Sequence, residues 1–200
     1  MTYEPGVVLL DTPIPGLFKM IIALTGKKLS GKSTAAKVLQ DALQGETKIL
    51  SFAYRIKKEV EKIFGPYDPH DADEKKLLRP VYQAVGQAYK ERYGEDIWVE
   101  ALASDWHEVQ PYYEHLIIDD LRFPYEADWV HSEGGLVWRL TGQFTDNDNH
   151  ISETMIEHIN ADRDFTNDGT TNFINQIRIA ADEVANRDSQ TTSPGALGNL

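Results

Sequence analysis

The run from Gly26 to Ser33 carries the most evident chemistry, and it reads Gly-Lys-Lys-Leu-Ser-Gly-Lys-Ser. It matches the phosphate-binding pattern Gly-x-x-x-x-Gly-Lys-Ser/Thr at every fixed position. The glycines let the backbone curl so that its N–H groups point at nucleotide phosphates, and the helix that follows adds the positive end of its dipole. Lys32 would reach the β- and γ-phosphates, and the Ser33 hydroxyl would bind Mg²⁺. The motif therefore predicts a site for ATP with Mg²⁺.

The positions that we assign to the nucleotide lie in this loop and in the first turn of the helix after it. They are Gly26, Lys28, Ser30, Gly31, Lys32, Ser33 and Thr34. Lys27 and Lys28 add positive charge at the rim of the loop, although ordinary solvated loop lysines are an equally good interpretation. A chance glycine-lysine loop is disfavoured because this one follows an apolar run and precedes a helical pattern.

Two acids follow the apolar run His115-Leu-Ile-Ile. Asp119 and Asp120 stand at the predicted tip of a strand, where a carboxylate can hold Mg²⁺ or one of its waters. Acids at strand ends are also common as simple caps, but beside a phosphate loop we favour the metal role. Periodicity does not decide which of the two faces the metal; we assign Ser33 and Asp120 as the metal ligands.

The elements that must position these residues alternate along the chain. Apolar runs and helical spacing predict strands at 19–25, 48–52, 113–119, 136–140 and just before Asn167, and helices at 32–43, 55–64, 76–93, 97–107, 124–132, 152–160 and 171–184. This alternation predicts an α/β fold with a parallel sheet that is covered by helices on both faces.

Composition narrows the class of protein. The net charge of -12 disfavours nucleic acid as a partner, because phosphate neutralisation dominates such binding. No apolar run is long enough to cross a membrane, and the N-terminus lacks the basic region of a signal peptide. The chain has no cysteine, which excludes disulfides, thiolate metal sites and cysteine catalysis. We expect a cytoplasmic protein, in the host cytoplasm if a phage encodes it.

Several segments resemble a known family. The segment Asp120-Leu-Arg-Phe-Pro-Tyr-Glu-Ala resembles the Asp-Val-Arg-Phe-Pro-Asn-Glu-Ala signature of phage-type deoxynucleoside monophosphate kinases. Three further segments agree in the same order: Ser51-Phe-Ala-x-x-x-Lys57; Gln83-x-x-Gly-Gln with Arg92 and Asp96-Ile-Trp-Val; and His150-x-Ser-Glu with Asn167-Asp-Gly-Thr. The resemblance covers residues 19–185.

The resemblance implies a three-layer P-loop kinase fold with a helical segment for the acceptor nucleotide and a short lid. Mapped onto this chain, the kinase domain spans 19–185, the acceptor segment 53–110 and the lid 141–153. Residues 1–18 would be a leader, and residues 186–200 a disordered tail. The implied reaction transfers the γ-phosphoryl group of ATP to a deoxynucleoside monophosphate and yields the diphosphate for DNA synthesis.

The resemblance also implies roles for individual residues. The catalytic cations would be Lys32, Lys57, Arg122 and Arg139. The acceptor site would use Phe52, Lys57, Arg79, Gln83, Arg92, Trp98, Asp120 and Arg122. Asn167 and Gly169 would border the adenine of ATP. Plainer interpretations stay open for some of them: exposed helix-face arginines for Arg79 and Arg92, core aromatics for Phe52 and Trp98, and an ordinary turn at Asn167.

One feature departs from the family. Lids of such kinases contribute arginines to the transferring phosphoryl group, whereas residues 141–150 contain none, and Arg139 is the nearest cation. Either Arg139 does this work or the lid has a weaker role here, and ATP binding is not affected. Two other functions are kept as alternatives: a P-loop kinase of a modified nucleotide or base in DNA hypermodification, and a nucleotide-binding module without an acceptor. The base of the acceptor and the oligomeric state are open, and residues 1–18 could serve as the arm of a homodimer.

Overall fold

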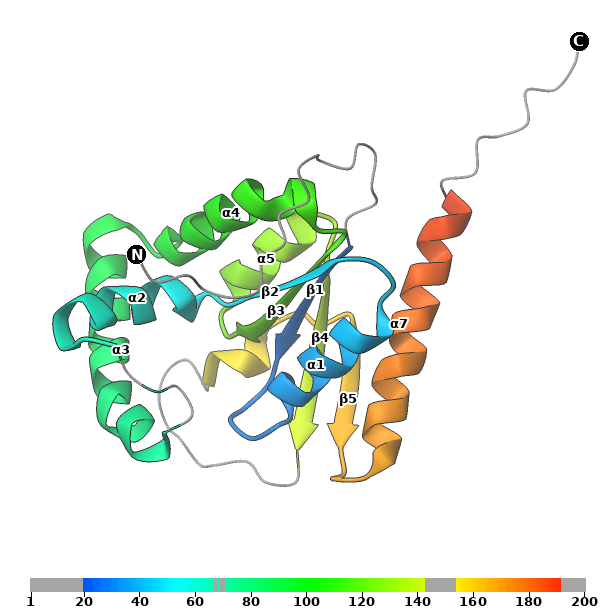
Figure 1. The fold of residues 1–200 in the computed structure, drawn as a ribbon, viewed down its shortest axis with the longest axis horizontal. Helices are drawn as coiled ribbons and strands as arrows, with labels where there is room; N and C mark the ends of the chain where they lie inside the picture. Colours follow the sequence, from blue (N-terminus) through cyan, green and yellow to red (C-terminus); the bar gives the residue numbers. More distant parts are fainter. Residues whose placement is uncertain (1–19, 67, 69–70, 143–153, 192–200) are drawn as a thin grey trace, which may run out of the picture.

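The computed structural model describes residues 20–66, 68, 71–142 and 154–191. Its centre is a parallel sheet with the strand order β2-β3-β1-β4-β5 (Figure 1). The strands are β1 (Met20–Thr25), β2 (Thr47–Leu50), β3 (His115–Leu121), β4 (Leu136–Gly142) and β5 (Arg163–Asn167). Every residue of β1 is buried, as expected for a central strand that is covered on both faces.

The helices are α1 (Lys32–Ala42), α2 (Ala53–Phe64), α3 (Ala72–Tyr93), α4 (Ile97–Val109), α5 (Pro124–Ser132) and α7 (Thr171–Thr191). Two short 3-10 helices are η1 (Gln110–Tyr112), between α4 and β3, and η2 (Met155–His158), between β4 and β5. Among the described helices, none combines the length and apolar character that crossing a bilayer requires.

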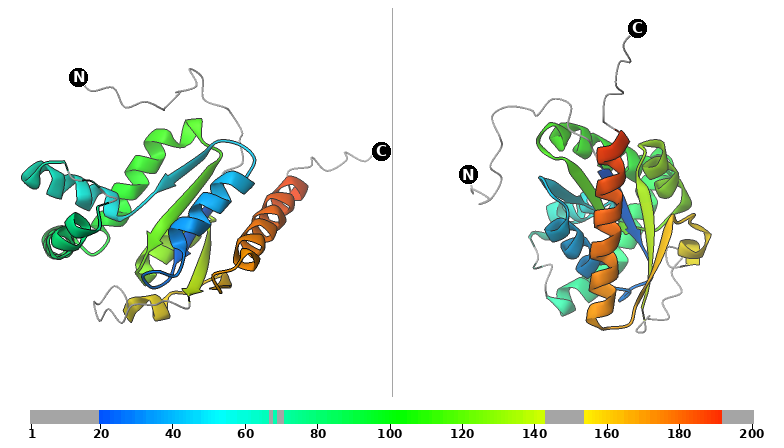
Figure 2. Two further views of the ribbon diagram at one scale, coloured as in Figure 1. Left: turned by 60° about the horizontal axis from the view of Figure 1, so that its bottom comes forward. Right: turned by 90° about the vertical axis from the view of Figure 1, so that its right-hand side faces the viewer.

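Two apolar clusters hold the layers together. On one face, Ile22 and Leu24 of β1 pack with Leu39 of α1 and with Phe173 and Ile177 of α7. On the other face, the alternate residues of β1 pack against α4, α5 and η2. The right-hand view of Figure 2 shows α7 running along its face of the sheet. The predicted three-layer α/β fold, with a parallel sheet between two layers of helices, is confirmed.

Helices α2 and α3 form an arm beside the sheet, on the β2 side (Figure 1). The side chain of Asp71 accepts hydrogen bonds from the N–H groups of Asp73 and Glu74, which starts α3 earlier than the expected residue 76. Pro80 lies inside α3, where it removes one backbone donor. The arm lies within the predicted acceptor segment 53–110.

Some boundaries differ from the expectation. Strand β3 begins at His115 and continues through both acids to Leu121, and α7 extends beyond residue 184 to Thr191. Where a helix was expected at 152–160, the described part is the short 3-10 helix η2. The leader 1–18, residues 143–153 of the lid and residues 192–200 of the tail lie outside the described residues.

Candidate functional site

The carboxyl ends of the parallel strands gather the predicted residues at one edge of the sheet. The phosphate loop follows β1, Phe52 follows β2, and Arg122 follows β3. Gly142 ends β4 and Asn167 ends β5. This edge of the sheet is therefore where the phosphate-binding loop and most of the candidate side chains come together.

The phosphate loop has the backbone that its glycines predict. Gly26 and Gly31 have φ angles of 143° and 98°, in the region that glycine tolerates best. A side chain at Gly26 would collide with the carbonyl of Leu140, and one at Gly31 would collide with the side chain of Asn167. Leu29 also has a positive φ, of 68°, which marks a tightly curled loop. Helix α1 then begins at Lys32, directly after the second glycine.

The side chain of Lys32 hydrogen-bonds to the backbone of the phosphate loop. Its Nζ donates hydrogen bonds to the carbonyl oxygens of Gly26, at 2.5 Å, and of Lys27, at 2.9 Å. Both bonds hold the ammonium at the mouth of the loop, where the phosphates of a nucleotide would lie. Ser33 and Thr34 follow on the first turn of α1, and both are exposed.

The loop suits a triphosphate chain. Ser30 is fully buried, and its Oγ is a hydroxyl without a hydrogen-bond partner among the described residues. The first turn of α1 has no acidic residue that would repel an anion at the helix N-terminus. No group of three or more potential metal-ligating His, Asp or Glu residues occurs in the described part of the chain. Magnesium needs only one or two protein ligands beside phosphate oxygens and water, so Ser33 and one carboxylate suffice.

The loop after β5 supports the phosphate loop from the side. The Nδ2 of Asn167 donates to the carbonyl of Ser30 at 3.3 Å, and the N–H of Gly169 donates to Oδ1 of Asn167 at 3.0 Å. The predicted Asn167 thus contacts the phosphate loop directly, and Gly169 is joined to the side chain of Asn167. Their predicted contact with adenine stays a prediction.

The two acids of β3 have different surroundings. Asp120 accepts the backbone N–H groups of Phe52 at 2.8 Å and of Ala53 at 3.0 Å, so its carboxylate holds the start of α2. Burial, together with the neighbouring charge of Asp120, raises the pKa of Asp119 to about 6, and the charges of Lys57 and Lys32 act against this shift. Asp119 therefore lies within electrostatic reach of both lysines.

A bulge in the sheet accompanies this acid pair. Ala23 pairs with Ile118 and Thr25 with Leu121, so β3 advances three residues while β1 advances two. An extra residue on one strand breaks the alternation of side chains between the two faces. This irregularity explains why alternation along the sequence could not decide how Asp119 and Asp120 point.

The turn between β3 and α5 carries Arg122. Oε2 of Glu126 accepts the N–H groups of Arg122 at 2.6 Å and of Phe123 at 3.0 Å. Burial raises the pKa of Glu126 to about 8, although these two hydrogen bonds favour its charged form. Sequence reasoning did not single out Glu126 as a site residue. Pro124 in the first turn of α5 followed by a glutamate two residues later is the local signal for such a backbone cap.

Arg139 lies beside the phosphate loop but is held by its neighbours. Its guanidinium donates to the carbonyl of Ile159 and lies 3.4 Å from a carboxylate oxygen of Asp164. It lines a cavity of about 420 Å³ with Gly26 and Lys27, next to the 3.1 Å ion pair of Lys27 with Glu157. The structure thus places Arg139 next to the loop, in a position that also braces β4 against β5.

The aromatic candidates are both buried. Phe52 is 4% exposed and meets Trp129 edge to face. Trp98 is 5% exposed, donates from Nε1 to the carbonyl of Gly86 at 3.1 Å, and lies 5.1 Å from the ring of Tyr89.

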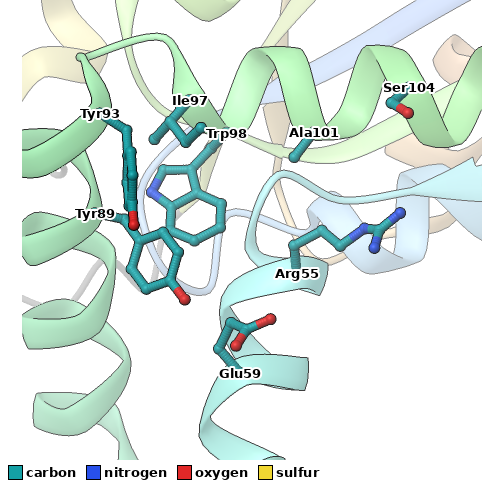
Figure 3. Close-up of a pocket in the computed structure, with 8 residues that line it drawn as sticks. All are labelled: Arg55, Glu59, Tyr89, Tyr93, Ile97, Trp98, Ala101 and Ser104. Carbon is teal, nitrogen blue, oxygen red and sulfur yellow. The ribbon is translucent and has the colours of Figure 1, made fainter.

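Trp98 also lines a groove of about 410 Å³ where α2, α3 and α4 meet (Figure 3). The other lining residues are Arg55, Glu59, Tyr89, Tyr93, Ile97, Ala101 and Ser104. None of the other predicted acceptor residues lines this groove. Trp98 is thus the predicted acceptor residue that lines this groove, and its predicted contact with the acceptor stays a prediction.

The remaining candidates lie on the arm. Lys57 is exposed on α2, Arg79 and Gln83 are half-buried on α3, and Arg92 is exposed near the end of α3. Arg92 lies over the ring of its neighbour Tyr93, at 5.9 Å. Lys57 acts on a carboxylate of the sheet edge, through its effect on Asp119.

Neither the models of protein families nor the sequences of curated proteins give a match to this chain. Solved structures do. Shikimate kinase from Bacteroides thetaiotaomicron is 14% identical, with a TM-score of 0.43 over 84% of this chain and 98% of that chain. A gluconokinase from Sinorhizobium meliloti is 13% identical, with a TM-score of 0.46 over 88% and 99%. A variant of the APS kinase of Mycobacterium tuberculosis is 15% identical, with a TM-score of 0.40 over 85% and 96%. These likenesses concern the fold, and the function proposed below rests on the residues of this chain.

Proposed function

We propose that this protein is an ATP-dependent kinase that phosphorylates a deoxynucleoside monophosphate to the diphosphate. One observation carries the proposal: Asp119 is influenced by both Lys32 of the phosphate loop and Lys57 of the arm. The charge of a cation in the donor site and that of a cation in the predicted acceptor segment therefore both act on one carboxylate at the sheet edge. Transfer between two phosphates needs this arrangement, because it depends on positioning and positive charge more than on covalent catalysis.

In the proposed phosphoryl transfer, different residues of the chain would bind the donor and the acceptor. The phosphate loop and Lys32 would hold the β- and γ-phosphates of ATP. Lys57 and Arg122 would hold the phosphate of the acceptor in line with the γ-phosphorus, and an arginine fork can bind it through two hydrogen bonds. Bound Mg²⁺ would neutralise charge on the phosphates. Arg139 is proposed as a further cation beside the loop.

For the metal we propose Ser33 together with Asp119. Asp120 was the first choice from sequence, but both of its oxygens accept backbone N–H groups of Phe52 and Ala53. The charge of Lys32 in the phosphate loop acts on Asp119, which supports a place for this carboxylate beside the phosphates. Asp120 would then act on the acceptor side, by fixing the start of α2.

An acceptor screen tests the function. The protein is incubated with ATP, Mg²⁺ and each common or modified deoxynucleoside monophosphate in turn, and diphosphate formation is measured. We expect transfer to at least one monophosphate. ATP binding without transfer to any monomeric nucleotide would refute the proposal and leave a nucleotide-binding module.

Two variants test whether the activity measured in the screen depends on the phosphate loop. Lys32→Ala should abolish turnover while leaving the thermal midpoint within a few degrees, because the two hydrogen bonds of the lysine to Gly26 and Lys27 stay within the loop itself. Lys37→Ala is the matched control, since Lys37 is an exposed lysine of the same helix that pairs with Asp41. Equal activity of the two variants would overturn the phosphate-loop assignment.

A further inference from the structure

Lys90 is a lysine in an unusual place for a helix that borders solvent. Its side chain is 9% exposed. Its Nζ lies 3.6 Å from the centroid of the Phe123 ring and 5.2 Å from that of Tyr125. The carboxylate of Glu95 is 4.0 Å away. An ammonium in this position has exchanged water for the faces of two aromatic rings, a contact worth more when it is desolvated.

The face of α3 that carries Lys90 also carries two of the predicted acceptor residues. Arg79, Gln83 and Lys90 are spaced four and seven residues apart, so they form one stripe along the helix. Tyr89, in contrast, points to the groove that contains Trp98. Lys90 therefore sits at the far end of the acceptor stripe, where the arm touches the core of the protein.

The rings under Lys90 belong to the turn that carries Arg122 and to the first turn of α5 that follows it. Phe123 and Tyr125 stack on each other, with centroids 5.3 Å apart and an interplanar angle of 11°. Glu126 is buried next to them and holds the N–H groups of Arg122 and Phe123. Burial lowers the pKa of Lys90, and the charges of Glu126 and Glu95 act against this. Lys90, the ring pair and Glu126 thus form one continuous unit from α3 to the backbone of Arg122.

We propose that Lys90 is a positioning residue that joins the acceptor arm to the Arg122 turn, so that α3 and the Arg122 guanidinium are set as one body. The inference rests on the proposed function, in which Arg122 holds the acceptor phosphate. Lys90 acts through the ring of Phe123 and the carboxylate of Glu126 rather than by touching a substrate.

Steady-state kinetics test the proposal with three variants. Lys90→Met keeps the length of the side chain and a favourable contact with the rings but removes the charge. Lys90→Arg keeps a cation that can stack on an aromatic face. Lys62→Met is the control, because Lys62 is an exposed lysine of the same arm that pairs with Glu59.

We expect Lys90→Met to lower kcat/KM for the monophosphate by about tenfold and to leave the KM for ATP within about twofold. Lys90→Arg should recover most of the loss, and Lys62→Met should behave as wild type. Unchanged kinetics with the monophosphate would overturn the proposal. So would an equal loss for ATP and monophosphate accompanied by a lower thermal midpoint, because that pattern describes a merely structural lysine.

Hydrogen exchange gives a readout that does not depend on turnover. The amides of Arg122 and Phe123 are the donors to Glu126, and NMR resolves them individually. We expect both to exchange at least several-fold faster in Lys90→Met than in wild type, while the amides of β1 are unchanged. Unchanged protection at Arg122 and Phe123 overturns the joining role even in an active enzyme. If wild type phosphorylates no monophosphate, the proposed function fails, and the exchange rates alone decide whether Lys90 fixes the turn.

Discussion

Replacing Asp119 with asparagine should make the protein more stable and less active. Asparagine has nearly the shape of aspartate but cannot be charged. Asp119 is held beside Asp120 in a partly buried site where its charged form is disfavoured, and burial is the main reason that its pKa is raised to about 6 from 3.8. The native state therefore tolerates the charge at neutral pH at the expense of its own stability.

The magnitude follows from the two pKa values. The difference between about 6 and 3.8 corresponds to about 3 kcal/mol. Because Asp119 is only partly buried, we expect about 2 kcal/mol, which is about 4–8 °C in the thermal midpoint of a chain of this size. A carboxyl whose pKa is higher in the folded state contributes its stabilisation fully below about 3.8 and loses it as the pH rises through about 6. The Asp119→Asn variant should thus be more stable than wild type at pH 7.5 and have nearly the same stability as wild type at pH 4.

Thermal unfolding of wild type and Asp119→Asn at pH 7.5 and pH 4, without nucleotide or metal, measures this difference. Asp128→Asn is the control, since Asp128 is exposed on α5. In the presence of ATP and Mg²⁺, kcat of Asp119→Asn should fall by about 10–100-fold, as for the loss of a group that orients a metal's water. A variant destabilised equally at both pH values would refute the reasoning, because it would show that the carboxylate is favoured as an anion.

Two further variants separate packing from catalysis. Trp98→Phe should lower the free energy of unfolding by about 1–2 kcal/mol in urea titrations, because the buried carbonyl of Gly86 loses its donor; a loss below about 0.5 kcal/mol would contradict a packing role. Arg139→Met should lower it by about 1–3 kcal/mol, because the Ile159 carbonyl and Asp164 lose their shared partner, whereas Asp164→Asn should change it by less than about 1 kcal/mol. If Arg139→Met instead leaves the free energy of unfolding unchanged and lowers kcat, the result would favour a catalytic role of Arg139 as the cation of the lid.

The part of the site that was readable from sequence is local. The run from β1 through the phosphate loop to α1 is contiguous, and each of its features has its cause within a few residues: the apolar strand, the two glycines with positive φ, and the helix that begins at Lys32. The alternation of strands and helices is sufficient to predict the parallel sheet and the two helical layers that cover it. These are short-range patterns, and the chain repeats them consistently.

The rest depends on contacts between distant segments. Lys90 looks like a solvated lysine of an amphipathic helix, and its partner Phe123 is far along the chain. The different surroundings of Asp119 and Asp120 depend on a bulge in the sheet. This bulge is defined only when β3 pairs with β1. The extra first turn of α3 had a local signal, the cap at Asp71, but the surrounding acids made the segment look like a loop.

The central place of β1 in the sheet has a consequence for how the protein is made. Residues Met20 to Thr25 pair with His115–Leu121 on one side and with Leu136–Gly142 on the other. On the ribosome, the most apolar strand is therefore synthesised long before either of its neighbours exists. Such non-local pairing slows folding and leaves apolar surface exposed in the meantime. The phosphate loop is among the first segments of the site to be synthesised. The strands and loops that surround it in the folded protein are synthesised later, so the loop reaches its final environment only when most of the sheet is complete.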